Sequence, residues 1–431
     1  MLPGRGSDMN DSKLQAPERT RIRTVETTGR QVLVDWEDGH RSRFHHQWLR
    51  DNCFCARCGD TWTGKRFIML TDFEADVHPS HAECDAHGRL VIHWDGEPHR
   101  SVYEPFWLRR HCYSKAERER RRFRPNLWDA SMTEQLPTVD YPRARADRRV
   151  LFELYGYLRD FGIVRVREVP ADEQGSRSLG ELIGVLQDYG YGEIQDIASV
   201  VDYSGELAAD VEDTSGTYQL TLPTNNPIPP HTDQLFHYAH PGIIFFHCVE
   251  PNPQGGGASV MVDGFRVVED LRAQAPDAFA LLSTVPQMFT RHIPEASADI
   301  GGFGRGVDFR GGGRAICLNT DGDVVGFRYH SRATAPLDVP EALMEPLYAA
   351  NRELVSRLND EHYQVRFTLA AGEAVILDNH RVLHAREGFS GRRHLRLFQV
   401  GREEFHNRLR MLANELGDES ADWLLPGGAL G

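Results

Sequence analysis

Alternation of apolar and polar residues predicts short strands over the first quarter of the chain. Residues 32–36 and 90–94 are rich in branched and aromatic side chains, and an acidic turn that contains glycine follows each run. The longer segments VDWEDGHRSRFHHQWLRDNC and IHWDGEPHRSVYEPFWLRRHC also resemble each other, with a strand, a turn, His-Arg-Ser and Trp-Leu-Arg in the same order. We therefore predict one small β domain with an internal pseudo-repeat over residues 21–113, preceded by a flexible tail at residues 1–20.

A run of charged residues follows this domain. Lys115–Arg124 holds six basic and two acidic residues and ends before Pro125. Such a run is typically a solvated helix, so we predict a linker over residues 114–148, and a nucleic-acid-binding arm is the alternative.

The pattern beyond residue 148 predicts a larger domain. Helical periodicity is expected over Val150–Phe161, Ser176–Leu186, Pro340–Leu358 and Glu403–Glu415. Strand-like runs, most of them after His231, cover Gly242–Cys248, Ser259–Val262, Tyr363–Leu369, Ala374–Leu377 and Leu395–Val400. Many strands with few helices predict a β-sandwich or barrel with helical additions over residues 149–416, then a tail over residues 417–431. Gly301–Gly313 contains seven glycines and is predicted to be a mobile loop.

Length and composition narrow the class of protein. A chain of 431 residues is too long for one ordinary core, and 40% hydrophobic residues exclude wholesale disorder. The formal net charge of -14 argues against a general electrostatic grip on nucleic acid or anionic lipid. A membrane span is not expected, because no apolar stretch reaches about 18 residues. The N-terminal residues also lack the apolar core of a secretory signal, so we expect a cytoplasmic protein without nucleic-acid or membrane partners.

Three crowded cysteines indicate a metal site rather than disulfides. Cys53, Cys55 and Cys58 form a Cys-x-Cys-x-x-Cys motif, whose thiolates suit tetrahedral zinc in a reducing compartment. A fourth ligand is needed, and the candidates are His99, His93, His87, Cys84, His111 and Cys112. The pseudo-repeat favours His99, because it lies just beyond the second strand and turn. A site closed by four protein ligands would be structural.

A second metal motif lies in the larger domain. His231 and Asp233 are two residues apart, so on a strand they share one face. His384, far along the chain, can complete a triad of two histidines and one carboxylate, the arrangement of non-haem Fe(II) oxygenases. Asp378 and Asn379 are candidates for positioning the strand that carries His384. The arginine pair at 392–393 could bind a dicarboxylate such as 2-oxoglutarate.

At these residues the sequence resembles the γ-butyrobetaine hydroxylase and trimethyllysine hydroxylase branch of the taurine-dioxygenase-like superfamily. The resemblance extends from about Arg21 to Leu416 and includes WLRDNCFCARC, the HTD at 231–233, GGGASVMVDGF at 255–265, DNHRVLHARE and RRHL. It implies a small N-terminal zinc-binding β domain and a C-terminal double-stranded β-helix (jelly-roll) catalytic domain. Family members are often homodimers.

The resemblance also implies roles for individual residues. It assigns iron to His231, Asp233 and His384, and the distal carboxylate of 2-oxoglutarate to Arg393 with Ser259. It assigns a structural zinc ion to Cys53, Cys55, Cys58 and His99. The implied activity is Fe(II)- and 2-oxoglutarate-dependent hydroxylation, with O2 as co-substrate, of an unactivated C–H bond in a small zwitterionic substrate.

The substrate site departs from the family pattern. Tyr203 is an aromatic in the region where relatives cage a trimethylammonium group, but Leu207, Pro223 and Gln399 stand where further aromatics are expected. Arg328 and His330 lie where relatives meet the substrate carboxylate. We therefore predict γ-butyrobetaine to be a poor substrate. The alternatives are the same chemistry on an amino acid or an aminophosphonate, or desaturation of the substrate instead of hydroxylation. A non-catalytic jelly-roll binding protein is the alternative from another class.

Overall fold

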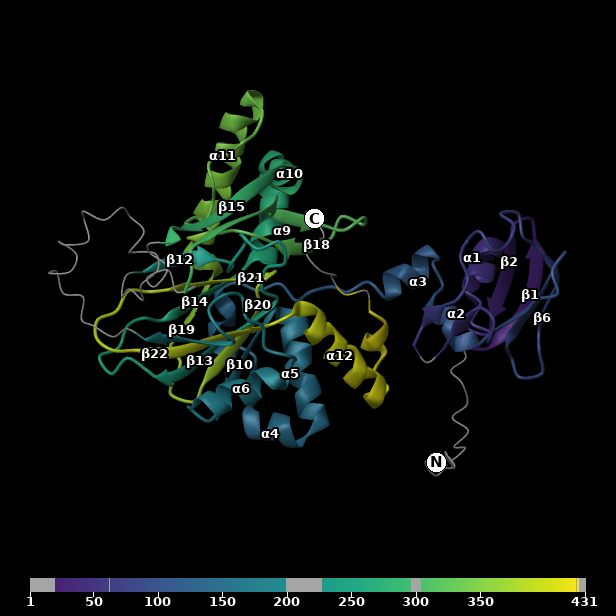
Figure 1. The fold of residues 1–431 in the computed structure, drawn as a ribbon, viewed down its shortest axis with the longest axis horizontal. Helices are drawn as coiled ribbons and strands as arrows, with labels where there is room; N and C mark the ends of the chain where they lie inside the picture. Colours follow the sequence, from purple (N-terminus) through teal and green to yellow (C-terminus); the bar gives the residue numbers. More distant parts are fainter. Residues whose placement is uncertain (1–19, 62, 199–226, 296–303, 424, 426–431) are drawn as a thin grey trace. The chain divides into compact units, whose positions relative to one another are not determined.

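The chain folds into two compact units, residues 1–122 and 123–431. The computed structural model describes residues 20–61, 63–198, 227–295, 304–423 and 425 (Figure 1). The predicted zinc motif lies in the first unit and the predicted iron motif in the second.

The first unit consists of two similar halves. Each half has a three-stranded antiparallel sheet followed by a short helix, with the orders β1-β2-β3 and β6-β7-β8. The bounds are β1 Ile22–Thr28, β2 Gln31–Trp36, β3 Arg41–His45 and α1 His46–Asp51 in the first half, and β6 Pro79–Cys84, β7 Leu90–Trp94, β8 Arg100–Tyr103 and α2 Pro105–Arg110 in the second. The short pair β4 Gly59–Asp60 and β5 Lys65–Arg66 lies between the halves in sequence, and α3 Lys115–Arg120 follows them.

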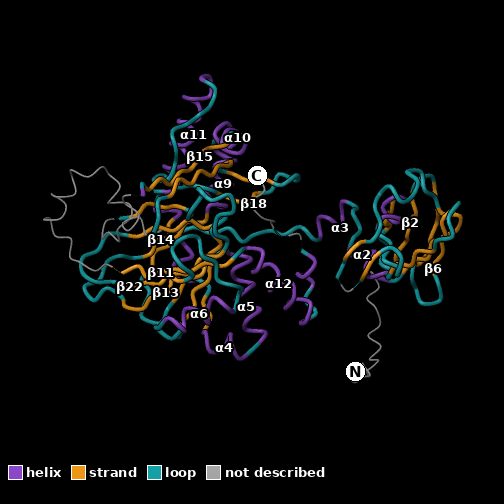
Figure 2. Tube along the Cα trace, in the orientation of Figure 1, coloured by secondary structure: helices purple, strands orange, loops and turns teal. Residues whose placement is uncertain are grey.

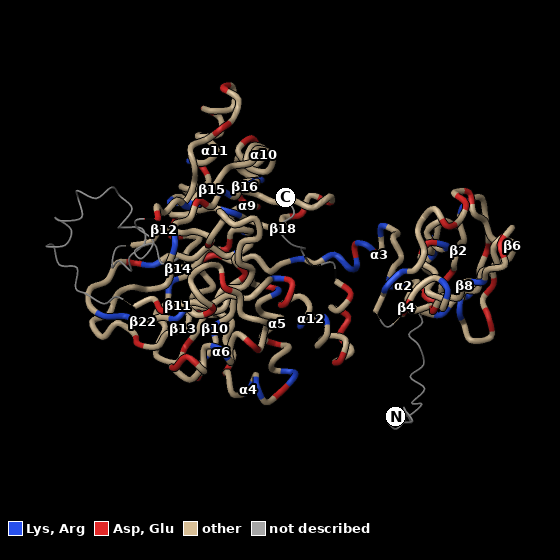
Figure 3. The backbone as a smooth tube through the Cα atoms, viewed as in Figure 1, with Lys and Arg blue, Asp and Glu red and all other residues tan. Residues whose placement is uncertain are grey.

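Alternation of side chains gives this unit its core. Every second residue of β2 is buried, and β7 is buried apart from His93. The two halves share one hydrophobic cluster, which includes Val34, Trp36, Ile92 and Trp94. The charged run forms the helix α3, which carries both basic and acidic residues (Figure 3), but it is not fully solvated, because Glu117 is buried.

The second unit is built on two sheets. The six-stranded sheet has the order β11-β22-β13-β20-β10-β9, and the four-stranded sheet has the order β12-β21-β14-β19. Residues from both sheets, among them Ile244 and Leu377 from the first and Met261 and Val365 from the second, form a single hydrophobic cluster. The two sheets therefore pack face to face. The bounds are β9 Thr138–Asp140, β10 Ile163–Arg167, β11 Ile194–Ala198, β12 Ile228–His231, β13 Ile243–Glu250, β14 Ser259–Asp263, β19 Gln364–Phe367, β20 Ala374–Asp378, β21 Val382–Arg386 and β22 His394–Val400.

Helices cover the outer faces of this pair of sheets. α5 and α12 bury their apolar faces in a cluster with the six-stranded sheet, while α9 and α11 pack in another cluster with β14 and β21 (Figures 1 and 2). The helices are α4 Tyr141–Ala146, α5 Arg148–Phe161, α6 Glu173–Glu181, α9 Gly264–Gln274, α10 Pro276–Thr284, α11 Glu341–Leu358 and α12 Arg402–Leu416, with 3-10 turns η2 Ala130–Gln135, η4 Glu361–Tyr363 and η5 Glu419–Asp422. None of the described helices combines the length and hydropathy that a membrane span needs.

Two local predictions differ from the structure. The helix expected at Ser176–Leu186 lies earlier, at Glu173–Glu181. It begins there because the Asp172 carboxylate accepts a hydrogen bond from the Gly175 amide and caps α6. The loop expected over Gly301–Gly313 is wrong for its described second half, because β15 Pro286–Ile293 and β16 Val307–Arg314 form an antiparallel pair. A Cβ atom at Gly311 would lie 2.6 Å from the Leu235 carbonyl oxygen, so glycine here permits close packing rather than mobility. The remaining pair is β17 Ile316–Leu318 and β18 Val324–Phe327.

Residues of the predicted linker take part in both units. α3 is in the first unit, where the buried Glu117 pairs with Arg109. β9 pairs in parallel with β10 of the second unit.

Candidate metal centres and active site

Neighbouring strands bring two distant histidines together. His231 ends β12 and stands directly opposite His384 on the antiparallel strand β21. Their ring centroids are 4.2 Å apart. The Nδ1 atom of His231 lies 2.9 Å from the Pro229 carbonyl oxygen, which leaves Nε2 to face the site. Phe246 of β13 contacts the His384 ring, with 4.9 Å between the centroids.

Asp233 is positioned by a bend rather than by the strand. β12 ends at His231, and Gln234 adopts φ 56°, a left-handed conformation that turns the chain after Asp233. The Asp233 amide donates to the side chain of Asn379 at 2.7 Å, and the Asn379 amide donates back to the Asp233 carbonyl at 3.1 Å. Asn379 is fully buried. This reciprocal pair fixes the backbone that carries the carboxylate.

The carboxylate of Asp233 lies between both imidazoles. Its Oδ1 is 3.3 Å from His231 Nε2, and its Oδ2 is 3.5 Å from His384 Nε2. These distances are close to the separation of about 3 Å between neighbouring ligands of one octahedral metal ion. Two imidazoles and one carboxylate are also the donor chemistry of non-haem iron sites. The residues therefore fit a single metal ion.

The electrostatics favour the ligating forms of Asp233 and His384. Burial by itself would raise the pKa of Asp233, but the adjoining His384 and His231 outweigh burial and hold that pKa well below its usual value. Burial, aided by His231, lowers the pKa of His384. The carboxylate is thus ionised and the His384 imidazole neutral near pH 7, as metal ligation requires.

His330 also lies at this site, whereas Arg328 does not. The Thr232 amide donates to the Tyr329 carbonyl at 2.8 Å, and this bond draws the segment after β18 alongside His231. Ligand atoms of His231, Asp233 and His330 all lie within 4.8 Å of one another. Arg328 points elsewhere, with Nη1 3.2 Å from the Cys317 sulfur. Burial lowers the pKa of His330 well below its usual value, so it is neutral.

A cavity of about 170 Å³ extends from the triad between the two sheets. Ser259 and Arg393, both predicted to bind the co-substrate, contribute to its lining, together with Phe246 and Met261. The Arg393 guanidinium lies 5.8 Å from the centre of the Phe389 ring. Burial lowers the pKa of Arg393, yet an arginine remains charged at neutral pH.

Arg386 is a lining residue that sequence reasoning missed. It is two residues beyond His384 on β21 and stands opposite both Ser259 and Ile228 on the neighbouring strands. Its guanidinium lies over the Phe389 ring at 4.8 Å, on the same ring that Arg393 contacts. Its spacing from His384 could have revealed it, because residues i and i+2 of a strand share one face.

Part of the predicted substrate site lies outside the described residues. Tyr203, Leu207 and Pro223 belong to that part of the chain. Gln399 is buried and lines a neighbouring hollow with Gln187 rather than the cavity of the triad.

The predicted zinc ligands form a compact cluster in the first unit. His99 Nε2 lies 3.4 Å from Cys53 Sγ, 4.0 Å from Cys55 Sγ and 3.6 Å from Cys58 Sγ. A tetrahedral zinc ion separates sulfur and nitrogen ligands by about 3.5 Å, given its bond lengths. Burial and the adjacent thiols raise the pKa of Cys58 to about 12, which a bound cation would reverse. These four donors therefore fit one tetrahedral ion, and among the six candidates for the fourth ligand it is His99 that meets the thiols.

Two imidazoles and one carboxylate beside an open cavity are the donor set typical of non-haem iron oxygenases. Residues 119–398 match the family described as "Taurine catabolism dioxygenase TauD, TfdA family", and residues 23–109 match "Gamma-butyrobetaine hydroxylase-like, N-terminal". The chain belongs to the TauD, TfdA family and is a dioxygenase. Membership implies dependence on Fe(II) and 2-oxoglutarate.

The relatives agree with this membership over nearly the whole chain. The gamma-butyrobetaine dioxygenase of Pseudomonas sp. (strain AK-1) is 32% identical over 387 residues, covering 88% of this chain and 93% of that protein. The gamma-butyrobetaine dioxygenase of Homo sapiens is 28% identical over 392 residues, covering 88% and 94%. The trimethyllysine dioxygenase of Meyerozyma guilliermondii is 26% identical over 410 residues, covering 89% and 94%.

Proposed function

We propose that this dioxygenase hydroxylates an unactivated C–H bond of a small zwitterionic substrate, using Fe(II), 2-oxoglutarate and O2. The observation that carries the proposal is the convergence of His231, Asp233 and His384 in a cavity that also holds two guanidinium groups. The two facing sheets are proposed to be the double-stranded β-helix of the catalytic domain.

His231, Asp233 and His384 would hold the iron. When bound there, the iron supplies O2 activation coupled to decarboxylation of 2-oxoglutarate. The protein supplies fixed ligands on one side, because Asn379 holds the Asp233 backbone and β12 and β21 hold the histidines. Three protein ligands leave the remaining coordination positions open to the co-substrates.

Arg393, Ser259 and Arg386 would bind the distal carboxylate of 2-oxoglutarate. Two residues along a strand span about 6.6 Å, so Arg386 is displaced from His384 by roughly the length of a five-carbon dicarboxylate. A carboxylate in this half-buried position gains charge-assisted hydrogen bonds from guanidinium groups. The mainly apolar remainder of the lining excludes water from the reacting centre.

The substrate class rests on the relatives and on the imidazole beside the triad. The relatives named above act on butyrobetaine and trimethyllysine, both zwitterions with a quaternary ammonium group. We infer that His330, which lies beside His231 and Asp233, meets the polar end of such a molecule. Leu207 and Pro223 stand where the sequence comparison expects cage aromatics, so γ-butyrobetaine itself is expected to react poorly; Gln399 does not enter this argument, because it lines a neighbouring hollow.

A structural zinc ion in the first unit is also part of this proposal, held by Cys53, Cys55, Cys58 and His99. Thiolate ligands support a reducing, cytoplasmic environment. A homodimer is expected from the family.

The test is succinate formation by the iron-loaded protein with γ-butyrobetaine, trimethyllysine, amino acids and aminophosphonates offered in turn. Anaerobic addition of 2-oxoglutarate to the Fe(II) protein should also produce a metal-to-ligand charge-transfer band. Loss of that band in His231→Ala is expected. A wild-type protein that binds Fe(II) and 2-oxoglutarate without the band, and forms no succinate, would leave the binding-protein alternative standing.

A further inference from the structure

The two halves of the first unit repeat each other down to individual hydrogen bonds. In the first half the Trp36 indole donates to the Ser42 hydroxyl at 2.8 Å, and in the second half the Trp94 indole donates to Ser101 at 2.9 Å. Both tryptophans end the middle strand of a sheet, and both serines lie in the following strand. The sequence similarity of the two segments therefore reflects a structural duplication.

Two salt bridges also join the halves, and each links the helix of one half to the turn of the other. Arg50 of α1 pairs with Glu97 in the turn of the second half, with Nε to Oε1 at 3.0 Å. Arg109 of α2 pairs with Asp38 in the turn of the first half, with Nη2 to Oδ2 at 2.9 Å. Such crossed pairing is what a local twofold arrangement produces. Each half must then present an equivalent corner to the other.

One of these two corners is the cluster of thiols described above. At it, Cys53 after α1 meets His99 from the other half, and Arg50 reaches Cys58 Sγ at 3.6 Å. Ser101 also hydrogen-bonds Cys53.

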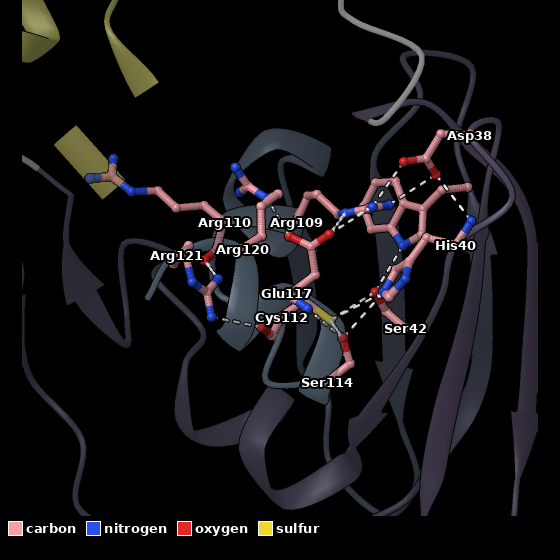
Figure 4. Close-up of polar contacts among 11 residues, drawn as sticks. Asp38, His40, Ser42, Arg109, Arg110, Cys112, Ser114, Glu117, Arg120 and Arg121 are labelled. Carbon is pink, nitrogen blue, oxygen red and sulfur yellow. Dashed lines mark hydrogen bonds and ion pairs between the residues drawn. The ribbon is translucent and has the colours of Figure 1, made fainter. Parts of the chain in front are cut away.

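The other corner repeats this arrangement with different chemistry (Figure 4). Cys112 after α2 lies 3.6 Å from His40 Nε2 of the other half, and Ser42 donates to the Cys112 sulfur at 3.2 Å. Cys112 follows Trp-Leu-Arg just as Cys53 does. At one constant offset along the chain, Ser114 takes the place of Cys55 and Glu117 takes the place of Cys58.

Each replaced residue keeps the contact of its counterpart. The Ser114 hydroxyl accepts from the Glu117 amide at 3.3 Å, as the Cys55 sulfur accepts from the Cys58 amide. Arg109 binds the Glu117 carboxylate at 2.8 Å, as Arg50 binds the Cys58 sulfur. The Ser114 hydroxyl also lies 3.4 Å from both Cys112 Sγ and His40 Nε2, so it occupies a ligand-like position.

The donors at this second corner are unsuited to zinc. A serine hydroxyl is a weak zinc ligand compared with a thiolate. The buried Glu117 is held by ion pairs to Arg109 and Arg120, whose guanidinium groups already satisfy its charge. Two strong donors, Cys112 and His40, do not complete a tetrahedral site.

We propose that His40, Cys112, Ser114 and Glu117 are the metal-free counterpart of the zinc corner, produced by internal duplication, and that Ser114 and Glu117 keep zinc out of it. The inference rests on the proposed zinc site. In place of metal bonds, this corner uses hydrogen bonds and the Arg109–Glu117 ion pair. It fastens α3 to the rest of the first unit. Arg121, directly after α3, also donates to the Cys112 carbonyl at 2.8 Å.

Restoring the two thiols tests this assignment. In the full chain, Ser114→Cys combined with Glu117→Cys should create a second site of three thiolates and one imidazole. Co(II) in place of zinc reports on it, because thiolate-to-cobalt charge transfer is absent from the nitrogen and oxygen ligands of the iron site. The charge-transfer intensity should roughly double relative to wild type. Adding His40→Ala should change the spectrum of the second cobalt ion only.

The matched control is Ser114→Ala with Glu117→Ala, which loses the same polar contacts and gains no thiol. Ser114→Cys alone keeps the Arg109–Glu117 ion pair, and it should bind the second cobalt ion more weakly. No added band in any thiol variant with wild-type circular dichroism would overturn the inference, as would two thiolate sites in the wild type. If the wild type has no thiolate–cobalt band, the zinc proposal fails and this inference fails with it.

Discussion

The two metal-type centres of this chain differ in how their ligands are assembled. In the first unit, three of the four donors come from one short segment, Cys53–Cys58, and His99 supplies the fourth. In the second unit, His231 and Asp233 are joined by His384 from a different strand, and the site opens into a cavity. The comparison teaches that a closed set of thiolates suits a structural role, whereas an open face of imidazoles and carboxylate suits catalysis.

The largest expected effect is on the stability of the first unit. Cys58→Ser removes a thiolate from the closed cluster, and structural zinc contributes on the order of 10 kcal/mol to folding in small zinc proteins. We expect the unfolding transition of the first unit to be lost, as followed by calorimetry. Fe(II) affinity of the second unit should be retained. Cys84→Ser, at a half-buried cysteine outside the cluster, is the control and should leave the transition in place.

The open site should respond in activity rather than in stability. His231→Ala or Asp233→Ala should lower turnover by more than about 100-fold, because even the residues that merely orient metal ligands typically contribute 10–100-fold. The melting temperature should change little, since these side chains line a cavity. Full succinate formation in either variant would refute the triad.

Arginine variants test which guanidinium groups bind the distal carboxylate of 2-oxoglutarate. Arg393→Ala removes a charge-assisted partner of a half-buried carboxylate, a loss of about 2–5 kcal/mol. At 1.4 kcal/mol per decade this weakens 2-oxoglutarate affinity by about 30-fold to several thousand-fold. Isothermal titration with 2-oxoglutarate and Mn(II) measures it. Arg386→Ala should also weaken the affinity, whereas the exposed Arg392 should tolerate alanine. If Arg392→Ala weakened 2-oxoglutarate affinity more than Arg393→Ala, then Arg392 and not Arg393 would be the ligand of the distal carboxylate.

The smallest effect should come from the support behind Asp233. Asn379→Ala removes both reciprocal bonds to the Asp233 backbone. Metal affinity should fall about 10–100-fold, as for other residues that orient ligands. Asn379→Asp retains the acceptor for the Asp233 amide and should recover part of the loss. Equal Mn(II) affinities for wild type and Asn379→Ala would show that the bend holds Asp233 unaided.

Local patterns predicted most elements, but contacts distant in sequence changed their details. The apolar periodicity of Val150–Phe161 and Ala374–Leu377 gave α5 and β20 almost to the residue. The glycine-rich stretch was predicted to be a loop because its signal for mobility resembles its signal for close packing. The pairing of β15 with β16 and the close approach of other residues to Gly311, Gly312 and Gly313 distinguish the two.

The sequence by itself determined the kind of metal that each motif suits, because thiolates, imidazoles and carboxylates keep their ligand chemistry wherever they lie. The tertiary structure decided which distant side chains lie beside each set, with His99 beside the thiols and both His384 and His330 beside His231 and Asp233. It selected His99 over five other candidates, placed Arg386 beside Ser259, and turned Arg328 away toward Cys317. The physical reason is that strand pairing and side-chain direction depend on long-range packing, which local spacing does not encode.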